Sequence, residues 1–337
     1  MSELATDTNL DARLEQHRIE LTAHCYRMLG SSFEAEDAVQ ETMVRAWRGH
    51  DGFEGRAALR SWLYRIATNV CFDMLKGRQR RARPMDLASP SPADSPVGER
   101  TSEAVWVLPI PDGRVLPTDG DPAELAVARE TIRLAFIGAL QHLPPRQRAV
   151  LLLRDVVRWK ATEVAELLDT TDASVNSALQ RARSTIAAAN IADTDPAMPM
   201  DDAQQQLLTR YVDAFERYDM ASLTSLIHED ATQSMPPYAM WLRGRDQILA
   251  FWRGQGAGCD GSRLVPTVAN GKPAFGQYKP SVTGDGHDPW ALQVLDIADS
   301  RLVELTFFLD TEALFPLFGL PLHLDPLEPG TTTHRLV

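Results

Sequence analysis

One stretch of this chain, residues 57–83, places two different faces on a single predicted helix. Apolar side chains at helical spacing predict a stripe that packs on a core, consisting of Leu59, Leu63, Ile66, Val70 and Met74. The face beside it is aromatic, amide and basic, and its members are Trp62, Arg65, Asn69, Asp73 and Lys76. The helix then runs into Arg78, Arg80, Arg81 and Arg83. The apolar stripe predicts that this helix packs within a helical domain, and the second face predicts an aromatic and basic outer surface.

The second face suits the chemistry of nucleic acids. Arginine side chains neutralise phosphates and release counterions, an aromatic ring stacks on an unpaired base, and the amide of Asn69 can pair with a base edge. A purely structural interpretation is also open on this stretch alone. Basic residues at the C-terminal end of a helix interact favourably with its dipole, and a half-exposed Trp62 is compatible with the edge of a core.

Formal charge is distributed unevenly along the 337 residues. The whole chain carries −12, which normally argues against DNA binding. Residues 12–83 nevertheless carry +4 and residues 122–190 carry +2, whereas residues 195–337 carry −9. The length and a hydrophobic content of 44% indicate a folded chain with more than one domain. The first two folded segments therefore remain candidate polyanion-binding domains.

Several classes of protein are disfavoured by the sequence. Cys25, Cys71 and Cys259 are scattered and have no C-x-x-C spacing, so we expect neither a disulfide framework nor a zinc site. No apolar run has the length of a membrane span, and the N-terminus lacks the basic and apolar regions of a signal peptide. We expect a cytoplasmic protein with no metal, no cofactor and no membrane contact.

Two further helices are predicted before residue 57. The first ends at Gly30, a natural helix stop, and its apolar side is interrupted only by Arg18. Ser31 opens the second helix, whose predicted core face consists of Val39, Met43 and Trp47, repeating every four residues. This spacing leaves an outward acidic face made of Asp37, Gln40 and Glu41. Such a face can dock on a basic partner or can simply be solvated.

Residues 12–83 resemble region 2 of the extracytoplasmic-function sigma factors of the sigma-70 family. The resemblance rests on the motif EDAVQETMVRAWR, a short F-x-G loop and the motif LRSWLYRIATNVCFDMLKGRQRR, in that order. In that family the acidic helix binds the clamp helices of the RNA polymerase β′ subunit, which implies this role for Asp37, Gln40 and Glu41. The following loop and helix melt the promoter −10 element and hold a flipped base. The resemblance implies contacts to this element for Phe53, Arg56, Trp62, Arg65, Asn69, Lys76 and Arg80.

Residues 84–121 are predicted to form an extended tether between two domains. They are rich in Pro, Ser, Asp and Gly, contain 7 acidic and 2 basic residues, and show no sustained period. One apolar island at residues 105–111, VWVLPIP, is expected to pack either on a domain of this chain or in a groove of the polymerase. In sigma factors this linker threads toward the polymerase active site and the RNA exit path.

A helix-turn-helix is predicted within residues 122–190. Asp121 and Pro122 cap a helix whose apolar side runs to Leu143, and a second helix with a buried run at 150–153 follows. Two short helices come next, and Thr171 is the predicted N-cap of the second. The second helix of such a motif reads bases in the major groove. Its outward residues are Ser174, Asn176, Ser177, Gln180, Arg181 and Arg183.

The motif LPPRQRAVLLL and the turn that follows it are similar to region 4 of the same sigma family, which reads the −35 element. Helical motifs of this shape also occur as protein-interaction modules, so the match to region 2 earlier in the chain is what favours DNA. Together the two matches imply binding to promoter DNA and to the β′ and β subunits of core RNA polymerase. The recognition helix holds few basic residues, which favours a module that works only when tethered beside region 2.

Residues 200–337 are predicted to form an α+β cone. Helices around Leu208, Leu223 and Gly244 precede three or four strand-like runs of a curled antiparallel sheet, and residues 299–301 form the turn between the last two runs. This order resembles the SnoaL-like branch of the nuclear-transport-factor-2-like superfamily. Candidate pocket residues are His228, Tyr238, Trp241, Trp252, Asp296 and Phe308. Some members of that superfamily are enzymes with an Asp general acid, although spacing singles out no partnered Asp and His in this chain.

The predicted fold class is multidomain: two all-α domains, at 12–83 and 122–190, are joined by the 84–121 linker and followed by an α+β cone at 200–337. The predicted function is that of a sigma factor that directs core RNA polymerase to promoters and has no catalytic site. The acidic cone, tied by a few residues to two basic domains, is expected to contact both and to regulate the factor. The alternatives are a SnoaL-like enzyme or ligand sensor with a DNA-binding N-terminal module, and an operator-binding repressor, which the acidic face disfavours.

Overall fold

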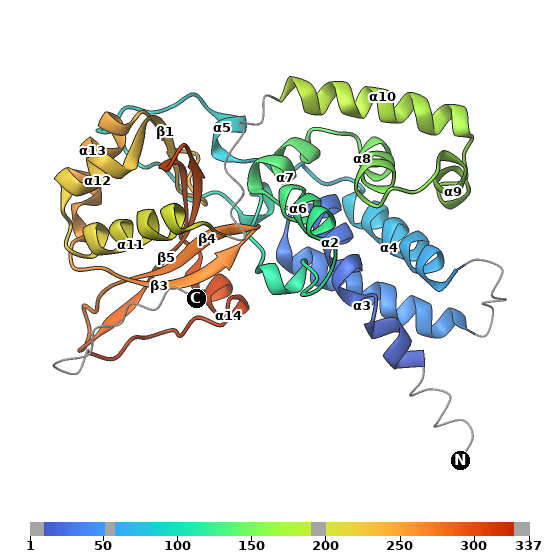
Figure 1. Cartoon of the computed structure of the whole chain (residues 1–337), viewed down its shortest axis with the longest axis horizontal. Helices are drawn as coiled ribbons and strands as arrows, with labels where there is room; N and C mark the ends of the chain where they lie inside the picture. Colours follow the sequence, from blue (N-terminus) through green and yellow to red (C-terminus); the bar gives the residue numbers. More distant parts are fainter. Residues whose placement is uncertain (1–9, 51–57, 190–199, 327–337) are drawn as a thin grey trace, which may run out of the picture. The chain divides into compact units, whose positions relative to one another are not determined.

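The computed structural model describes residues 10–50, 58–189 and 200–326, and the chain divides into two compact units. The first unit is helical and contains the chain up to residue 81 together with the chain from residue 107 to the end of the helix-turn-helix (Figure 1). The second unit contains residues 82–106 and the sheet-bearing C-terminal part. The two predicted helical domains thus share one unit, and the predicted linker is divided between the two units.

Helices build the first part of the helical unit, and three of them are described in full (Figure 1). They are α2 (Arg18–Leu29), α3 (Ser32–Gly49) and α4 (Leu59–Leu75). Helix α2 ends at Gly30, whose φ of 73° is the left-handed conformation that glycine adopts without strain. Helix α3 begins after Ser31, whose hydroxyl accepts a hydrogen bond from the backbone N–H of Glu34. The predicted helix stop and the predicted helix start are both confirmed.

The core face of α3 differs from the predicted one. Trp47 is 54% exposed, and Met43 is only half-buried. The buried residues of α3 are small: Ser32, Ala35, Ala38, Val39, Thr42 and Ala46. Small side chains let neighbouring helix axes approach closely, which leaves no room for an indole between them. The prediction of Trp47 as a core residue is therefore wrong, whereas Val39 is confirmed as one.

The core stripe of α4 is confirmed only in part. Leu63 and Val70 are buried, whereas Leu59, Ile66 and Met74 are half-buried. The remaining buried positions of this helix are Tyr64, Ala67, Thr68 and Cys71. The buried face is therefore rotated from the predicted stripe toward a more polar set of side chains.

Five helices form the second part of the helical unit. They are α6 (Pro122–Glu130), α7 (Leu134–Gln141), α8 (Pro145–Leu151), α9 (Ala161–Leu167) and α10 (Asp172–Ala188). Helices α9 and α10 are the predicted helix-turn-helix, and Thr171 caps α10 by accepting a hydrogen bond from the N–H of Ser174. The prediction of one unbroken helix before Leu143 is wrong. The Thr131 hydroxyl bonds back to carbonyl oxygens of the preceding turn, and the chain starts α7 three residues later.

The apolar island of the linker packs on this chain. Val107, Leu108 and Ile110 are buried within the helical unit. The Tyr26 hydroxyl donates to the carbonyl oxygen of Leu108 at 2.8 Å, and the N–H of Leu108 donates to the carbonyl oxygen of Gly30 at 3.0 Å. The island therefore packs on a domain of this chain, which is one of its two predicted locations.

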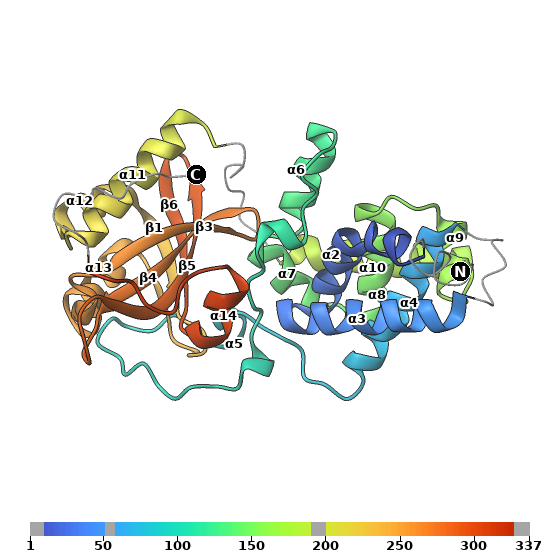
Figure 2. The same cartoon turned by 90° about the horizontal axis from the view of Figure 1, so that it is seen from below.

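The second unit is a curled sheet covered by helices (Figure 2). Its helices are α5 (Pro84–Leu87), α11 (Asp202–Glu216), α12 (Met220–Leu226), α13 (Arg245–Arg253) and α14 (Thr311–Leu317). Its strands are β1 (Ile227–Ser234), β2 (Trp241–Arg243), β3 (Arg263–Ala269), β4 (Lys272–Pro280), β5 (His287–Ala298) and β6 (Arg301–Phe308). The strand order is β2-β1-β6-β5-β4-β3. Neighbours are antiparallel, as predicted, except β1 and β6, which are parallel.

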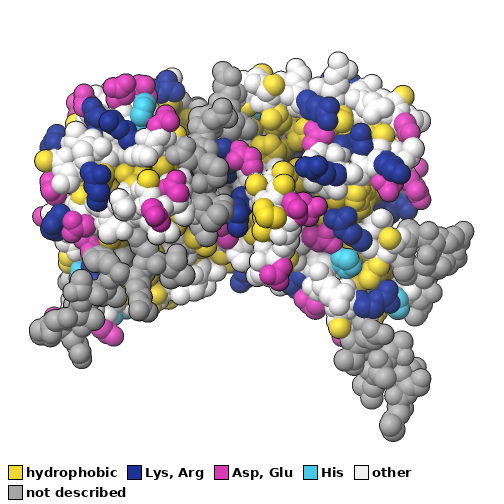
Figure 3. All heavy atoms as spheres, in the orientation of Figure 1, with side chains coloured by type: hydrophobic (Ala, Val, Ile, Leu, Met, Phe, Trp, Pro, Cys, Tyr) yellow, Lys and Arg dark blue, Asp and Glu magenta, His cyan; other side chains and the backbone are white. Residues whose placement is uncertain are grey.

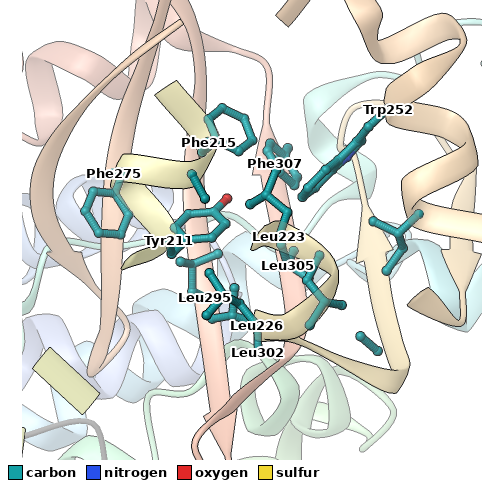
Figure 4. Packing of buried hydrophobic residues seen from close by; sticks show 14 of the residues in the cluster. Tyr211, Phe215, Leu223, Leu226, Trp252, Phe275, Leu295, Leu302, Leu305 and Phe307 are labelled. Carbon is teal, nitrogen blue, oxygen red and sulfur yellow. The ribbon is translucent and has the colours of Figure 1, made fainter. Parts of the chain in front are cut away.

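The core of the second unit lies between the concave face of the sheet and the helices. Aromatic and aliphatic side chains from α11, α12, α13 and the strands meet there, among them Tyr211, Phe215, Leu223, Trp252, Phe275 and Leu305 (Figure 4). Helix α14 covers the other face, where Phe315 packs against Tyr278 with ring centroids 5.1 Å apart. Helices first and a curled sheet after them confirm the predicted α+β cone.

Candidate polymerase-binding and promoter-binding surfaces

An acidic face projects from α3. Asp37, Gln40 and Glu41 are all exposed, because the helical period turns them away from the small buried residues of this helix. The Glu41 carboxylate accepts a hydrogen bond from Arg45 at 2.7 Å, and the other guanidinium arm of Arg45 reaches Asp73 at 3.4 Å. Exposed ion pairs of this kind contribute little to stability, so these side chains are free to exchange partners at low cost.

The second face of α4 is accessible to solvent. Asn69 and Arg65 are exposed one turn apart, and Trp62 is half-buried on the same side. The Trp62 ring lies so close to the backbone of Gly49 that a Cβ there would stand 3.3 Å from it. An indole held in this way is a preformed flat surface beside an exposed amide and an exposed guanidinium.

The basic residues after α4 are engaged within the helical unit. The Lys76 ammonium donates to Asp73 at 2.7 Å and lowers the pKa of that carboxyl. The Arg80 guanidinium lies 3.1 Å from Nδ1 of His142. Phe53 and Arg56, also predicted to contact the −10 element, lie outside the described residues.

The outward face of α10 carries the six residues predicted to read the −35 element. All of them are exposed: Ser174, Asn176, Ser177, Gln180, Arg181 and Arg183. Arg183 forms a two-bonded pair with Asp155, at 2.8 and 2.6 Å. On the face seen in Figure 3, Lys and Arg side chains are interspersed with Asp and Glu side chains over the helical unit. The surface is therefore of mixed charge, in line with a reader that depends on a second contact elsewhere.

The two parts that are predicted to read DNA touch each other within the helical unit. The Arg65 guanidinium of α4 donates to the carbonyl oxygen of Glu166 in α9 at 2.9 Å. The ring centroids of Tyr64 and Trp159 are 5.1 Å apart, and the Arg60 guanidinium lies over both rings. A side chain that is predicted to contact the promoter is thus occupied by a contact between α4 and α9.

Two buried arginines join the same parts more deeply. Arg148 of α8 is 2% exposed and donates to the backbone oxygen of Met28 at the end of α2, as well as to oxygens of Gln141 and Leu143. Arg27 of α2 donates to the hydroxyl of Thr131 at 2.8 Å and to carbonyl oxygens at the end of α6. Burial lowers the pKa of each guanidinium to about 10, so both stay charged at neutral pH. Carbonyl oxygens at helix ends carry partial negative charge and suit a cation.

Neither arginine is predicted as a contact residue from the sequence. A spacing clue exists for Arg148, which stands three and four residues before the buried Leu151 and Leu152 and therefore shares their helix face. The partner across the interface has no sequence signature, because it is a backbone carbonyl group.

The interior of the cone contains a chain of hydrogen-bonded polar side chains. The Tyr211 hydroxyl donates to Oε1 of Gln293 at 2.7 Å, and Nε2 of Gln293 donates to Oε1 of Gln277 at 2.9 Å. Gln277 in turn donates to the Ser262 hydroxyl at 3.0 Å. Burial raises the pKa of the Tyr211 phenol well above its usual range. These groups satisfy one another in the place where the sequence suggested a pocket.

The six predicted pocket residues lie on different faces of the second unit. Trp252 belongs to the concave core and donates to Gln233 at 2.7 Å. Asp296 alternates along β5 with the core residue Leu295, so it faces the opposite side, where Lys272 pairs with it at 2.9 Å. Phe308 stands beside Leu292, on the face of Asp296. The structure does not bring Trp252 together with Asp296 and Phe308.

The other three predicted pocket residues are also occupied elsewhere or lie at the edge. Trp241 is buried, and its indole N–H donates to the carbonyl oxygen of Ala88 at 2.8 Å. Half-buried His228 accepts a hydrogen bond from the N–H of Asp230 at its own Nδ1. Tyr238 is half-buried in the turn before β2.

Among the residues the structure describes, no helix is both long and apolar enough to cross a bilayer.

Three family descriptions match the chain in sequence order. They are Sigma-70 region 2 over residues 14–81, Sigma-70, region 4 over residues 133–186, and the SnoaL-like domain over residues 208–305. The two faces on α4 and α10 lie within the first two matches, and the cone contains the third. The class of protein is therefore a sigma-70-type transcription factor with a C-terminal SnoaL-like domain.

Similarity to individual proteins identifies the family more closely. The ECF RNA polymerase sigma factor SigG of Mycobacterium tuberculosis strain H37Rv is 47% identical over 318 residues, which cover 93% of this chain and 84% of that protein. This chain belongs to the family of extracytoplasmic-function (ECF) RNA polymerase sigma factors. SigJ of the same strain is 28% identical over 307 residues, covering 87% of this chain and 88% of SigJ. The crystal structure of Mycobacterium tuberculosis SigJ shares the fold, with a TM-score of 0.58 and 22% identity over 94% of this chain and 99% of that chain.

Proposed function

We propose that this sigma factor binds core polymerase and promoter DNA through three separate helices. The acidic face of α3 docks on the β′ clamp helices, the Trp62 and Asn69 side of α4 opens the −10 element, and the outward face of α10 reads the −35 element. The observation that carries this assignment is the joint exposure of polar side chains on these helices, inside the two sigma-70 matches. Region 4 also contacts the β subunit in this proposal.

The helical unit must open when it binds a promoter. The −10 and −35 elements are named for positions about 25 base pairs apart, which is on the order of 80 Å of DNA at 3.4 Å per base pair. Arg65 of the −10 reader instead touches Glu166 beside the −35 reader. The form described here is therefore a closed, free form, and polymerase shifts the population toward an open one.

The SnoaL-like domain is regulatory rather than catalytic in this proposal, and it takes the place of a separate anti-sigma protein by contacting the sigma regions and their linker. Two observations favour a domain that is not catalytic. The interior of the cone is committed to a hydrogen-bonded glutamine chain, and Asp296 is committed to Lys272 on the opposite face. In this proposal these polar groups stabilise the domain and take no part in a reaction.

Run-off transcription with core polymerase tests the function as a whole. Promoter DNA is first selected from a random library with the reconstituted holoenzyme. We expect transcripts only when both this chain and core polymerase are present. Operator binding without any transcript would instead favour a repressor.

Reversing the charge of the acidic face should weaken binding to core polymerase. We expect Asp37→Lys with Glu41→Lys to lower the affinity at least tenfold, since both carboxylates face a basic partner in the proposal. The fold should survive, because surface changes usually cost under about 0.5 kcal/mol. Fluorescence anisotropy of labelled chain with core enzyme measures the affinity. The matched control is Asp213→Lys with Glu312→Lys, two exposed acidic positions of the second unit, and equal weakening by both pairs would refute the docking assignment.

Asn69→Ala should impair promoter opening without changing the −35 contact. A lost base contact costs on the order of 1 to 3 kcal/mol, so we expect a roughly five- to hundredfold loss of open complex. Permanganate footprinting of the −10 region measures opening. Gln180→Ala with Arg181→Ala is the contrasting variant and should weaken −35 recognition while leaving opening intact once the complex is saturated. Full permanganate reactivity with Asn69→Ala would remove the base-pocket role.

A further inference from the structure

Residues 88–101, which we name the strap, lie against the SnoaL-like domain without forming a helix or a strand. The strap belongs to a loop that is closed at its base. The N–H of Ala82 donates to the carbonyl oxygen of Val105 at 2.7 Å, and the Arg83 guanidinium lies 3.8 Å from the Glu304 carboxylate of β6. More than half of the predicted tether is therefore part of the second unit.

Trp241 holds the first part of the strap from two sides. Its indole N–H donates to the carbonyl oxygen of Ala88, and its own carbonyl oxygen accepts a hydrogen bond from the N–H of Ser91, each at 2.8 Å. Farther along, the N–H of Thr101 donates to the carbonyl oxygen of Pro237 at 3.0 Å. Both ends of the strap are thus bound through backbone atoms.

Two exposed glutamines bind the middle of the strap. Oε1 of Gln247 on α13 accepts a hydrogen bond from the N–H of Ala93 at 2.9 Å. Nε2 of Gln255 donates to the carbonyl oxygens of Ala93 and Ser95, at 3.2 and 2.8 Å. The side chain of Ala93 and that of Val97 pack at the edge of the apolar core. Side chains of the domain therefore recognise the strap backbone as they would an extended peptide.

The strap sequence suits this mode of binding. Its prolines at 90, 92 and 96 restrict the backbone in advance, so less conformational entropy is lost when the segment is ordered. Because the contacts are made to backbone groups and small side chains, no strong anchor prevents release. The geometry favours a segment that is held in the free protein and can be given up to a competitor.

Holding the closed loop 82–105, of which the strap is the middle, shortens the connection between the two predicted DNA readers. A free chain from residue 82 to residue 122 spans up to about 130 Å at roughly 3.3 Å per residue. With Ala82 fixed beside Val105, only the chain from residue 105 to residue 122 remains, which spans at most about 55 Å. Promoter elements on the order of 80 Å apart lie farther from each other than this chain can span. The remaining distance would have to be bridged by the widths of the two predicted DNA-reading parts.

We propose that the SnoaL-like domain is a clasp for the linker between regions 2 and 4, and that the strap leaves the clasp when the factor engages core polymerase and both promoter elements. The clasp and the polymerase complex then compete for one segment. This inference rests on the sigma-factor function. It assigns to the SnoaL-like domain a peptide-binding surface, made of Trp241, Pro237, Gln247 and Gln255, whose occupant is residues 88–101 of the same chain.

Hydrogen exchange of the free, full-length chain tests the clasp directly. We expect the peptide that contains the strap to exchange at least tenfold more slowly than an unstructured segment. Gln247→Ala with Gln255→Ala should accelerate this exchange several-fold and leave the α11 peptide unchanged. The matched control is Gln205→Ala with Gln206→Ala, two exposed glutamines of α11. Unprotected exchange in the parent chain, or exchange that the Gln247 and Gln255 changes do not accelerate, would overturn the clasp.

Affinity for core polymerase tests the competition. When only a fraction f of the molecules has a released strap and can bind polymerase, the apparent dissociation constant is 1/f times the intrinsic one. Loosening the strap raises f and should therefore strengthen binding. We expect the Gln247→Ala, Gln255→Ala chain to bind core polymerase about three- to tenfold more tightly, and the control pair to bind like the parent. Accelerated strap exchange with unchanged or weaker polymerase binding would overturn the competition. A parent chain that fails to bind core polymerase at all would instead refute the sigma-factor function.

Discussion

Arg148→Met is expected to destabilise the helical unit by about 2 to 4 kcal/mol. The substitution keeps the length and apolar stem of the side chain but removes the donors that satisfy buried oxygens of Met28, Gln141 and Leu143. Each buried acceptor left without a donor costs about 1 to 3 kcal/mol, and relief from burying a charge offsets part of the sum. Circular dichroism should show a melting midpoint lower by on the order of 10 °C.

Arg146→Met provides the matched control for this result. Arg146 lies two residues earlier, is exposed and makes one hydrogen bond, to the carbonyl oxygen of Leu168 at 3.2 Å. Its replacement should change the midpoint by 2 °C or less. Equal shifts in the two variants would mean that the buried hydrogen bonds of Arg148 do not stabilise the closed form.

Acidification is expected to destabilise the helical unit through His24. This side chain is 1% exposed, its Nε2 lies 3.0 Å from the Thr68 hydroxyl, and its ring centroid lies 5.1 Å from that of Tyr64. Burial, with a smaller contribution from the Arg27 charge, lowers the pKa of His24 to about 3. The unfolded chain protonates this residue near pH 6.5 whereas the folded chain does not, so stability is present above pH 6.5 and is lost as the pH falls toward 3.

The size of this effect follows from the shift. Each pH unit below 6.5 costs about 1.4 kcal/mol, so about 2.5 kcal/mol is lost between neutral pH and pH 4.5 from this residue alone. Urea titrations at both pH values measure the loss in the parent chain and in His24→Gln. The difference between the two chains isolates His24 from the carboxylates that titrate in the same range. A His24→Gln chain with the same pH dependence as the parent would contradict the assignment.

Helical period was enough to predict the outward faces from the sequence. Asp37, Gln40 and Asn69 are exposed where the pattern placed them, because a helix turns every residue by a fixed angle whatever it packs against. The pattern failed at Trp47, since hydrophobicity alone does not say that the neighbouring helix comes too close for an indole. The roles of the exposed residues toward polymerase and DNA remain predictions.

Contacts between distant parts of the chain could not be predicted. Arg27 and Arg148 are charged residues that a sequence pattern assigns to solvent, yet backbone carbonyl groups far along the chain bind them in the interior. The strap was predicted as a free tether because Pro, Ser and Asp leave it without an apolar period. Its binding depends on backbone atoms, and backbone atoms are the same in every sequence.

The division of the linker at residues 106 and 107 also has a consequence during protein synthesis. Residues 82–106 belong to a unit whose sheet is completed only when β6 leaves the ribosome, about 200 residues later. At roughly 5 to 20 residues per second, that interval lasts about 10 to 40 seconds. The residues of α2, α3 and α4 emerge before this interval, and those of the helix-turn-helix emerge within it. In each newly made molecule, residues 82–106 therefore wait for a completed sheet, and this part of the linker is restrained only when translation is nearly finished.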